Sequence, residues 1–69
     1  MIKILKRETT EIFQDNETII RKEELYQYNN STERNGHKIF MESVGFKVKS
    51  SVSSLNRVTY FKVDVVRSV

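Results

Sequence analysis

The segment that decides the fold is Asn35-Gly36-His37-Lys38-Ile39-Phe40-Met41-Glu42-Ser43-Val44-Gly45-Phe46-Lys47-Val48, because it has two interpretations. In the first, Asn35-Gly36 forms a type I′ turn, whose two central residues need the positive φ that Asn and Gly tolerate, and a strand follows. In the second, residues 37–44 form a short helix, Gly45 ends it, and a strand begins at Phe46. The first interpretation predicts an all-β fold and the second an α+β fold.

Composition favours strands. The chain has 69 residues with no Ala and only three Leu, whereas Val and Ile together number 14 and Tyr and Phe together number seven. β-branched and aromatic side chains fit a pleated surface, and the best helix formers are scarce. We therefore expect one small domain, residues 1–69, that is mainly β: an antiparallel four-stranded meander, with an α+β fold containing one short helix as the alternative.

Turn signals divide the chain into four segments of similar length. Besides Asn35-Gly36, the signals are Asp15-Asn16 and the polar loop 50–56. Segments of this kind joined by tight turns are typical of a meander. One segment has a helical alternative, because residues 16–26 offer an N-cap Asn and a Glu17–Arg21 pair at i,i+4, although their apolar residues form no stripe. The predicted segments are 2–14, 17–34, 37–50 and 57–68.

Pairing across these turns predicts two faces of the sheet. A two-residue turn at Asp15-Asn16 sets Ile12 opposite Ile19, and pairing Ser50 with Arg57 aligns the two strands that follow residue 37. Side chains alternate along a strand, so each register fixes which residues share a face. Residues 39 and 41 fall out of phase, which predicts a bulge between Glu42 and Gly45. The apolar face would carry Ile2, Ile4, Ile12, Ile19, Leu25, Val44, Phe46, Val48, Phe61, Val63 and Val65, and the outer face Lys3, Leu5, Tyr26, Tyr28, Lys47, Lys49, Tyr60 and Lys62.

The sequence contains no motif for catalysis. Absence of Cys excludes disulfides, thiolate metal sites and Cys nucleophiles. The one histidine, His37, follows a predicted turn without a paired nucleophile, so we expect it to be solvated. Glu23 and Glu24 are adjacent and point to opposite faces of a strand, and two glycines cannot make a phosphate-cradling loop. We therefore expect a non-enzyme without a metal or cofactor.

The charge distribution suggests a binding function. The net charge is +3, and residues 34–69 carry +5 of it against −2 for residues 1–33. Cations that neutralise phosphates, interleaved with aromatic rings that stack on bases, are typical of nucleic-acid-binding sheets. We expect a non-catalytic nucleic-acid-associated protein. Its predicted binding residues are Tyr26, Tyr28, Lys47, Lys49, Arg57, Tyr60 and Lys62.

The predicted apolar face also needs a cover. Without a helix, it must meet a second copy or another protein, or close into a barrel, so we expect a homodimer. The alternative function is a small inhibitor or adaptor, of the kind that phages and mobile elements encode, that binds a host protein such as a defence-system component. No segment approaches the roughly 20 apolar residues of a membrane span, and residues 1–7 are too short and too charged for a signal peptide. A cytoplasmic protein without membrane contact is expected.

Overall fold

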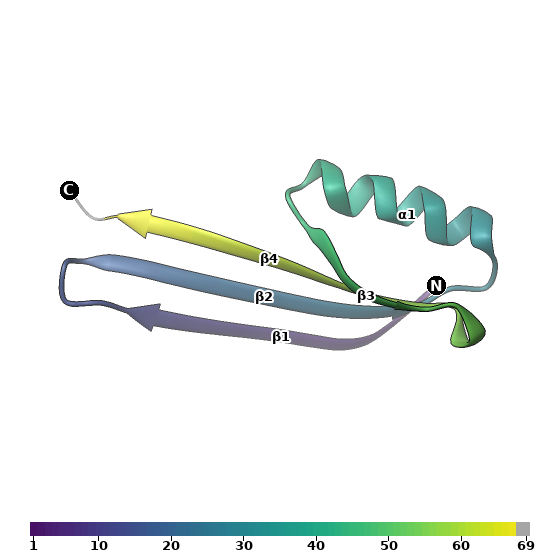
Figure 1. Cartoon of the computed structure of the whole chain (residues 1–69), viewed down its shortest axis with the longest axis horizontal. Coiled ribbons are helices and arrows are strands. Elements are labelled where there is room, and N and C mark those ends of the chain that lie inside the picture. The colour runs from purple at the N-terminus through teal and green to yellow at the C-terminus, as the bar shows by residue number, and fades with distance from the viewer. Residues whose placement is uncertain (68–69) are drawn as a thin grey trace.

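The computed structural model describes residues 1–67 and shows a four-stranded antiparallel sheet with one helix. The order of strands in the sheet is β1-β2-β4-β3, and α1 lies over one face (Figure 1). Both the predicted four-stranded antiparallel sheet and the alternative with one helix are confirmed. Residue 68, the last of the predicted segment 57–68, lies outside the described residues. The elements are β1 (Ile2–Ile12), β2 (Glu17–Gln27), α1 (Ser31–Ser43), β3 (Lys47–Val52), a 3-10 turn (Ser53–Leu55) and β4 (Arg57–Arg67).

The strand order differs from that of a simple meander because α1 separates β2 from β3. Asn35-Gly36 lies inside α1 and forms no hairpin turn, so the predicted pairing of β2 with the following strand is wrong. The helix begins after Asn30, whose side chain accepts a hydrogen bond from the Glu33 backbone N–H at 2.8 Å. This N-cap satisfies a helix donor that would otherwise be unpaired. Of residues 16–26, for which a helix was the alternative, all but Asn16 lie in strand β2.

The C-terminal end of α1 is a Schellman motif. Gly45 has φ +97°, a region that favours glycine, and it follows the C-cap residue Val44. The Phe46 N–H donates to the Met41 carbonyl at 3.0 Å, and the Gly45 N–H donates to the Glu42 carbonyl at 3.1 Å. Phe46 and Met41 both belong to the buried core. The irregularity predicted as a strand bulge between Glu42 and Gly45 is therefore the end of a helix.

The two glycines should respond oppositely to alanine. Gly45→Ala should lower the free energy of unfolding by about 1–3 kcal/mol, because a side chain is strained at this φ and the new Cβ would lie 3.1 Å from Lys62 Cε. Gly36→Ala should raise it by roughly 1 kcal/mol, because alanine favours a helix interior and no atom lies within 4 Å of the new Cβ. Urea unfolding of both variants tests this. Midpoints that move in the same direction would contradict the placement of Gly36 inside α1 and of Gly45 at its C-terminal end.

The β1–β2 hairpin has a three-residue loop. The Phe13 N–H donates to the Glu17 carbonyl at 2.8 Å, the Asn16 N–H donates to the Phe13 carbonyl at 3.1 Å, and Asn16 takes the left-handed conformation with φ 63°. A turn followed by a left-handed residue is the usual form of such a loop. The extra loop residue sets Ile12 opposite Thr18, so the predicted partner Ile19 is wrong by one position. A slip of one residue moves a strand's side chains to the other face relative to its neighbour.

The buried core lies between α1 and the sheet face beneath it, which we call the helix-covered face. It consists of Tyr26, Tyr28, Met41, Phe46, Val58 and Tyr60. The other side, the open face, carries Arg7, Glu23, Leu25, Phe61 and Val63, which the observed registers place together. The predicted grouping of Ile19, Leu25, Phe61, Val63 and Val65 on one face is confirmed. It is wrong for Ile12, Phe46 and Val48, which belong to the opposite side. The helix covers the tyrosine face instead.

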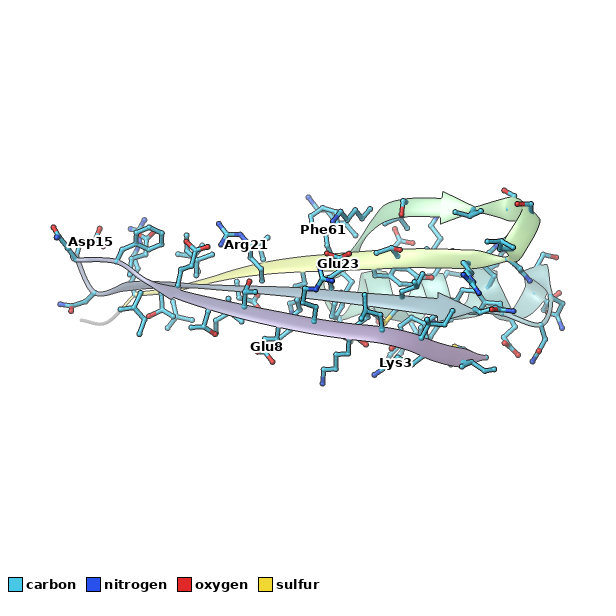
Figure 2. All side chains as sticks on the ribbon, turned by 90° about the horizontal axis from the view of Figure 1, so that it is seen from below. Lys3, Glu8, Asp15, Arg21, Glu23 and Phe61 are labelled. Atoms are coloured by element: carbon cyan, nitrogen blue, oxygen red, sulfur yellow. The ribbon has the colours of Figure 1, made fainter. Side chains whose placement is uncertain are left out.

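The three strands β1, β2 and β4 extend well beyond α1 (Figure 1). Strand β3 pairs with β4 only as far as Phe61, so residues 62–67 of β4 have no strand on that side within the described chain. We call residues 9–21 and 63–67 the distal ribbon; Asp15 marks its tip, remote from α1 (Figure 2). Most of its residues are exposed, whereas residues 17–20 and Asp64 are half-buried. The large apolar ones with at least two-fifths of their surface exposed are Ile12, Phe13, Val63, Val65 and Val66.

Candidate ligand groove on the open sheet face

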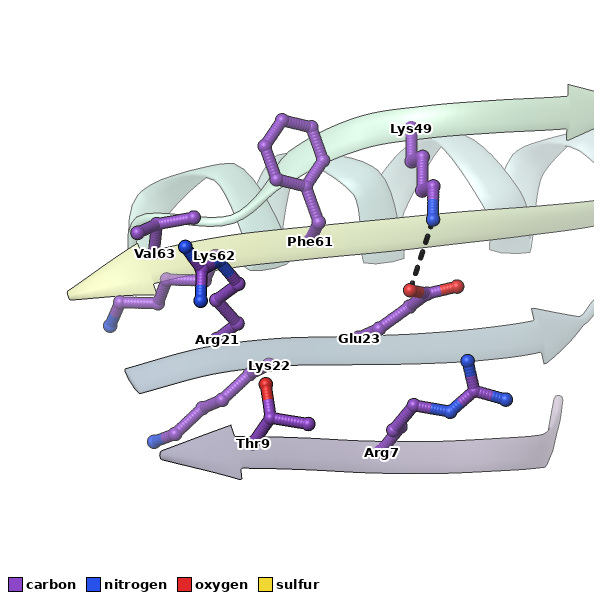
Figure 3. Close-up of a pocket in the computed structure, with 9 residues that line it drawn as sticks. All are labelled: Arg7, Thr9, Arg21, Lys22, Glu23, Lys49, Phe61, Lys62 and Val63. Carbon is purple, nitrogen blue, oxygen red and sulfur yellow. Dashed lines mark hydrogen bonds and ion pairs between the residues drawn. The ribbon is translucent and has the colours of Figure 1, made fainter. Parts of the chain in front are cut away.

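The open face contains a groove of about 330 Å³ where the distal ribbon meets the rest of the sheet. Strands β1, β2 and β4 form its base, and one lysine of β3 closes one side, with α1 on the far side of the sheet (Figure 3). The groove is open to solvent along its length. Its lining residues are Arg7, Thr9, Arg21, Lys22, Glu23, Lys49, Phe61, Lys62 and Val63.

Strand register brings the main lining residues together in two cross-strand rows. In one row Arg7 pairs with Glu23, Glu23 with Phe61, and Phe61 with Lys47. The next row begins at Thr9, which pairs with Arg21 of β2. Directly paired residues lie close enough to interact, so each row is a line of neighbouring side chains on one face. The groove is the space above these rows.

The second row runs Thr9, Arg21 and Val63 across three strands. Lys49 reaches the groove from a register shift in β3, between Val48 and Ser50. Its Nζ lies 3.1 Å from Glu23 Oε2 (Figure 3). A bulge re-aims side chains, which explains why Lys49 turns toward the groove.

The rim of the groove is strongly cationic. Five basic residues line it, against the single carboxylate of Glu23. Arg7, Arg21 and Lys49 lie on the open side, whereas Lys22 and Lys62 are paired with each other and rise from the helix-covered face. Lys49 pairs with Glu23, Arg21 with Glu11, and Lys62 lies 3.9 Å from Asp64, all at or near the surface. Within residues 1–67, Arg7 and Lys22 form no salt bridge. Exposed ion pairs contribute little energy, so these cations can exchange their carboxylates for an anionic ligand at little cost.

The floor of the groove is apolar. Phe61 and Val63 on β4 supply it, and the hydrocarbon stems of the lysines and arginines that line the groove complete it (Figure 3). Long basic side chains commonly lay their stems on apolar surface and keep the charged end in water. The groove therefore offers an aromatic ring on β4 beside cations that rise from β1, β2 and β3.

No family model, curated protein or solved structure matches this chain. Within residues 1–67, no three His, Asp or Glu side chains gather closely enough to hold a metal ion. No helix in that part of the chain is long and apolar enough to cross a membrane. The chemistry of the groove itself is thus what indicates a ligand.

The structure separates the predicted binding residues. The three tyrosines are buried beneath α1, and Tyr60 is 0% exposed, so the expectation that they lie on an outer face is wrong. Their rings cannot reach a base while the helix is in place. Lys49 and Lys62 line the groove, although Lys62 rises from the helix-covered face and its Nζ donates to the Val44 carbonyl at 2.9 Å.

The two remaining predicted residues lie on the open face outside the groove lining. Lys47 pairs with Phe61, and Arg57 pairs with Gln27, whose side-chain oxygen accepts from Arg57 Nε at 3.2 Å. Sequence reasoning missed Arg7 because the assumed two-residue loop displaced β1 by a position. It missed Arg21 and Phe61 because the tyrosine face was expected to be the exposed binding face, whereas α1 covers that face. The signal that could have given the right register is Asn16, because Asn tolerates the left-handed conformation that the third residue of a three-residue hairpin loop needs.

A polar network lies beneath α1, on the other side of the sheet. The Tyr28 hydroxyl is 2.6 Å from His37 Nδ1 and 2.8 Å from the Tyr60 hydroxyl. The His37 and Tyr26 ring centroids are 4.4 Å apart. His37 is half-buried on the inner side of the helix, so the prediction of a solvated turn histidine is wrong. Burial lowers the pKa of His37.

A second part of this network holds a buried carboxylate. Tyr26 donates a hydrogen bond to Glu24 Oε1 at 2.5 Å, and Lys3 Nζ lies 3.1 Å from the same oxygen. Burial works to raise the pKa of Glu24, but the hydrogen bonds from Tyr26 and Lys3 outweigh it and leave the pKa below its usual value. Burial also raises the pKa of the Tyr28 hydroxyl, so both it and Tyr60 stay protonated donors. Within residues 1–67, no buried side-chain nitrogen or oxygen lacks a hydrogen-bond partner.

Acidification should weaken the fold through His37. Neutral His37 can accept from Tyr28, which accepts from Tyr60, whereas a protonated ring reverses this chain and leaves the buried Tyr60 hydroxyl without an acceptor. The pKa of His37 is depressed in the folded state, so the unfolded chain takes up a proton more readily than the folded one. The contribution of neutral His37 to the free energy of unfolding is therefore fully present above about pH 6.5 and is lost as pH falls through the folded pKa. Urea unfolding between about pH 7.5 and 5 should show this loss, and His37→Gln, which keeps an acceptor, should flatten it. Parallel curves for both proteins would contradict the network's role.

Proposed function

We propose that this protein is a non-catalytic nucleic-acid-binding protein that contacts its ligand through the open face of its sheet. The observation that carries the proposal is that one groove combines the Phe61 ring with cations from three strands, Arg7, Arg21 and Lys49. Lysine and arginine bind phosphates and release condensed counterions, which supplies most of the affinity of non-specific binding. An accessible ring on a sheet adds stacking with bases.

Charge on the rest of the open face supports the same ligand. Three cations of this face, Arg7, Lys47 and Arg57, have no carboxylate partner within residues 1–67. Arg7 and Lys47 stand at opposite ends of the row that contains Phe61. Strands are about 4.8 Å apart, so about 14 Å separates these two ends of the row. A nucleic-acid strand that crosses the sheet along this row would meet a cation on each side of the ring.

A titration of labelled oligonucleotides tests the proposal. Single- and double-stranded DNA and RNA are added at low ionic strength, where phosphate contacts are strongest, and the affinity is then followed as salt rises. We expect binding whose logarithm falls linearly with the logarithm of salt concentration. Absence of binding to all four ligands at low salt would contradict the proposed function.

A second candidate function is protein binding by a small adaptor or inhibitor, and the distal ribbon favours it. Apolar side chains are exposed there on both faces, and residues 62–67 of β4 have no paired strand on one side within the described chain. A partner strand can add to such an edge, and a homodimer through β4 is the simplest form of this association. Val65→Lys should then remove association seen in sedimentation, or retention of a host protein, and leave oligonucleotide binding intact.

A further inference from the structure

Resting on the proposed nucleic-acid function, we propose that the groove binds one unpaired base on Phe61, so the preferred ligand is single-stranded nucleic acid. The first reason is the shape of the site. The groove has about 330 Å³, at the lower end of the range of small-ligand sites, which is about 300–1,000 Å³. A protein that reads a duplex inserts a helix or ribbon into a groove of the nucleic acid. Here the hollow is in the protein, and it receives a group that protrudes from the ligand.

The second reason is the chemical division between floor and rim. Phe61 and Val63 form an apolar floor on β4, while Arg7, Arg21 and Lys49 line the same groove from β1, β2 and β3 (Figure 3). An inorganic anion would leave the floor uncovered, and an apolar ligand would leave the cations unused. A nucleotide satisfies both, because its base has a flat ring face and its phosphates are anionic. Glu23 accepts hydrogen bonds and repels phosphate, so the phosphates belong on the arginine and lysine sides of the ring.

The third reason is that a duplex cannot use Phe61. Its bases are stacked inside the helix and its phosphates cover the outside, so only the cations of the open face would make contact. A single strand can splay a base outward and stack it on an aromatic ring. Because the ring is half-buried between neighbouring side chains, it is already ordered before the base arrives. Stacking therefore distinguishes a single strand from a duplex at this site.

Three ligands of equal length test the inference by fluorescence anisotropy at one salt concentration. They are a single-stranded oligonucleotide, its duplex, and a single strand of abasic deoxyribose phosphates. We expect the single strand to bind at least about fivefold more tightly than the other two, which corresponds to the lower limit of about 1 kcal/mol for one stacked base. The abasic strand isolates stacking, since it keeps the backbone charge and the flexibility.

Substitution of the ring completes the test. Phe61→Leu keeps an apolar floor and should lower single-strand affinity about fivefold, to the level of the abasic strand, while Phe61→Tyr should keep it. The matched control is Phe40→Leu, because Phe40 is an aromatic residue of α1 that is 57% exposed and lies away from the open face. We expect no change for this control. Urea unfolding midpoints of the three variants are measured to check that each variant remains folded.

The failures of the inference and of the proposed function are distinguishable. Equal affinity for the three ligands, with no effect of Phe61→Leu, would overturn the base-stacking inference and leave nucleic-acid binding in place. Absence of binding to every ligand at low salt would overturn both. Loss of affinity in Phe40→Leu equal to that in Phe61→Leu would also overturn the inference, because it would place the ligand on α1.

Discussion

Replacing Tyr60 with alanine should lower the free energy of unfolding by about 3–5 kcal/mol, as expected when a large aromatic side chain is removed from a core. Tyr60 is the one side chain within residues 1–67 that is completely buried. Its ring lies 6.0 Å from the Tyr26 ring centroid and 5.7 Å from that of His37, so its removal opens a cavity at the centre of the core. Small domains are stable by only about 5 kcal/mol or slightly more, so much of the population should unfold.

Tyr60→Phe is the matched control for this prediction. It keeps the ring and removes only the hydroxyl that lies 2.8 Å from the Tyr28 hydroxyl. The expected loss is about 1 kcal/mol, the usual net value of one hydrogen bond. Circular dichroism during urea unfolding measures both variants. A loss below about 1 kcal/mol for Tyr60→Ala would contradict a core centred on this tyrosine.

Reversing two charges of the groove, in the double variant Arg7→Glu and Lys49→Glu, should weaken single-strand binding about 100-fold at low salt. Each reversal replaces an attraction of about 1 kcal/mol to a nearby phosphate with a similar repulsion, which salt screening reduces. The slope of log affinity against log salt should become shallower by roughly 1.4, since each phosphate contact on a single strand contributes about 0.7. Anisotropy titrations at several salt concentrations measure both changes.

A control with the same net charge separates local contacts from overall charge. Lys6→Glu with Lys38→Glu changes two exposed lysines, one on the helix-covered side of β1 and one on α1. We expect a much smaller loss, because these positions lie away from the open face. An equal loss for both double variants would mean that the ligand responds to net charge only, and it would contradict binding in the groove.

Much of the fold could be predicted from local signals in the sequence. Strand content followed from the excess of β-branched and aromatic residues, and the helix end followed from Gly45, which is the glycine that takes a positive φ. The start of the helix was missed although Asn30 and Glu33 have the spacing of an N-cap and its partner. The strong turn propensity of Asn35-Gly36 concealed it. A local preference was overridden here by the helix on either side of it.

The candidate site could not be predicted, because it depends on register. Loop length at Asp15-Asn16 decides which side chains of β1 share a face with those of β2, and one residue more reverses that relation. Which face α1 covers is a tertiary property that no alternation pattern determines when both faces carry apolar residues. As a result Phe61 was assigned to an apolar face that a partner would cover, and the buried tyrosines to an exposed face.

Amide chemical-shift mapping by NMR tests binding through the open face most directly. A single-stranded oligonucleotide is added to the labelled protein, and the shift of each backbone amide is followed. We predict the largest shifts at Arg7, Arg21 and Phe61 and in β3 near Lys49, with α1 nearly unchanged. Largest shifts in α1 or at the tip of the distal ribbon, or none at low salt, would contradict binding of nucleic acid by the open face.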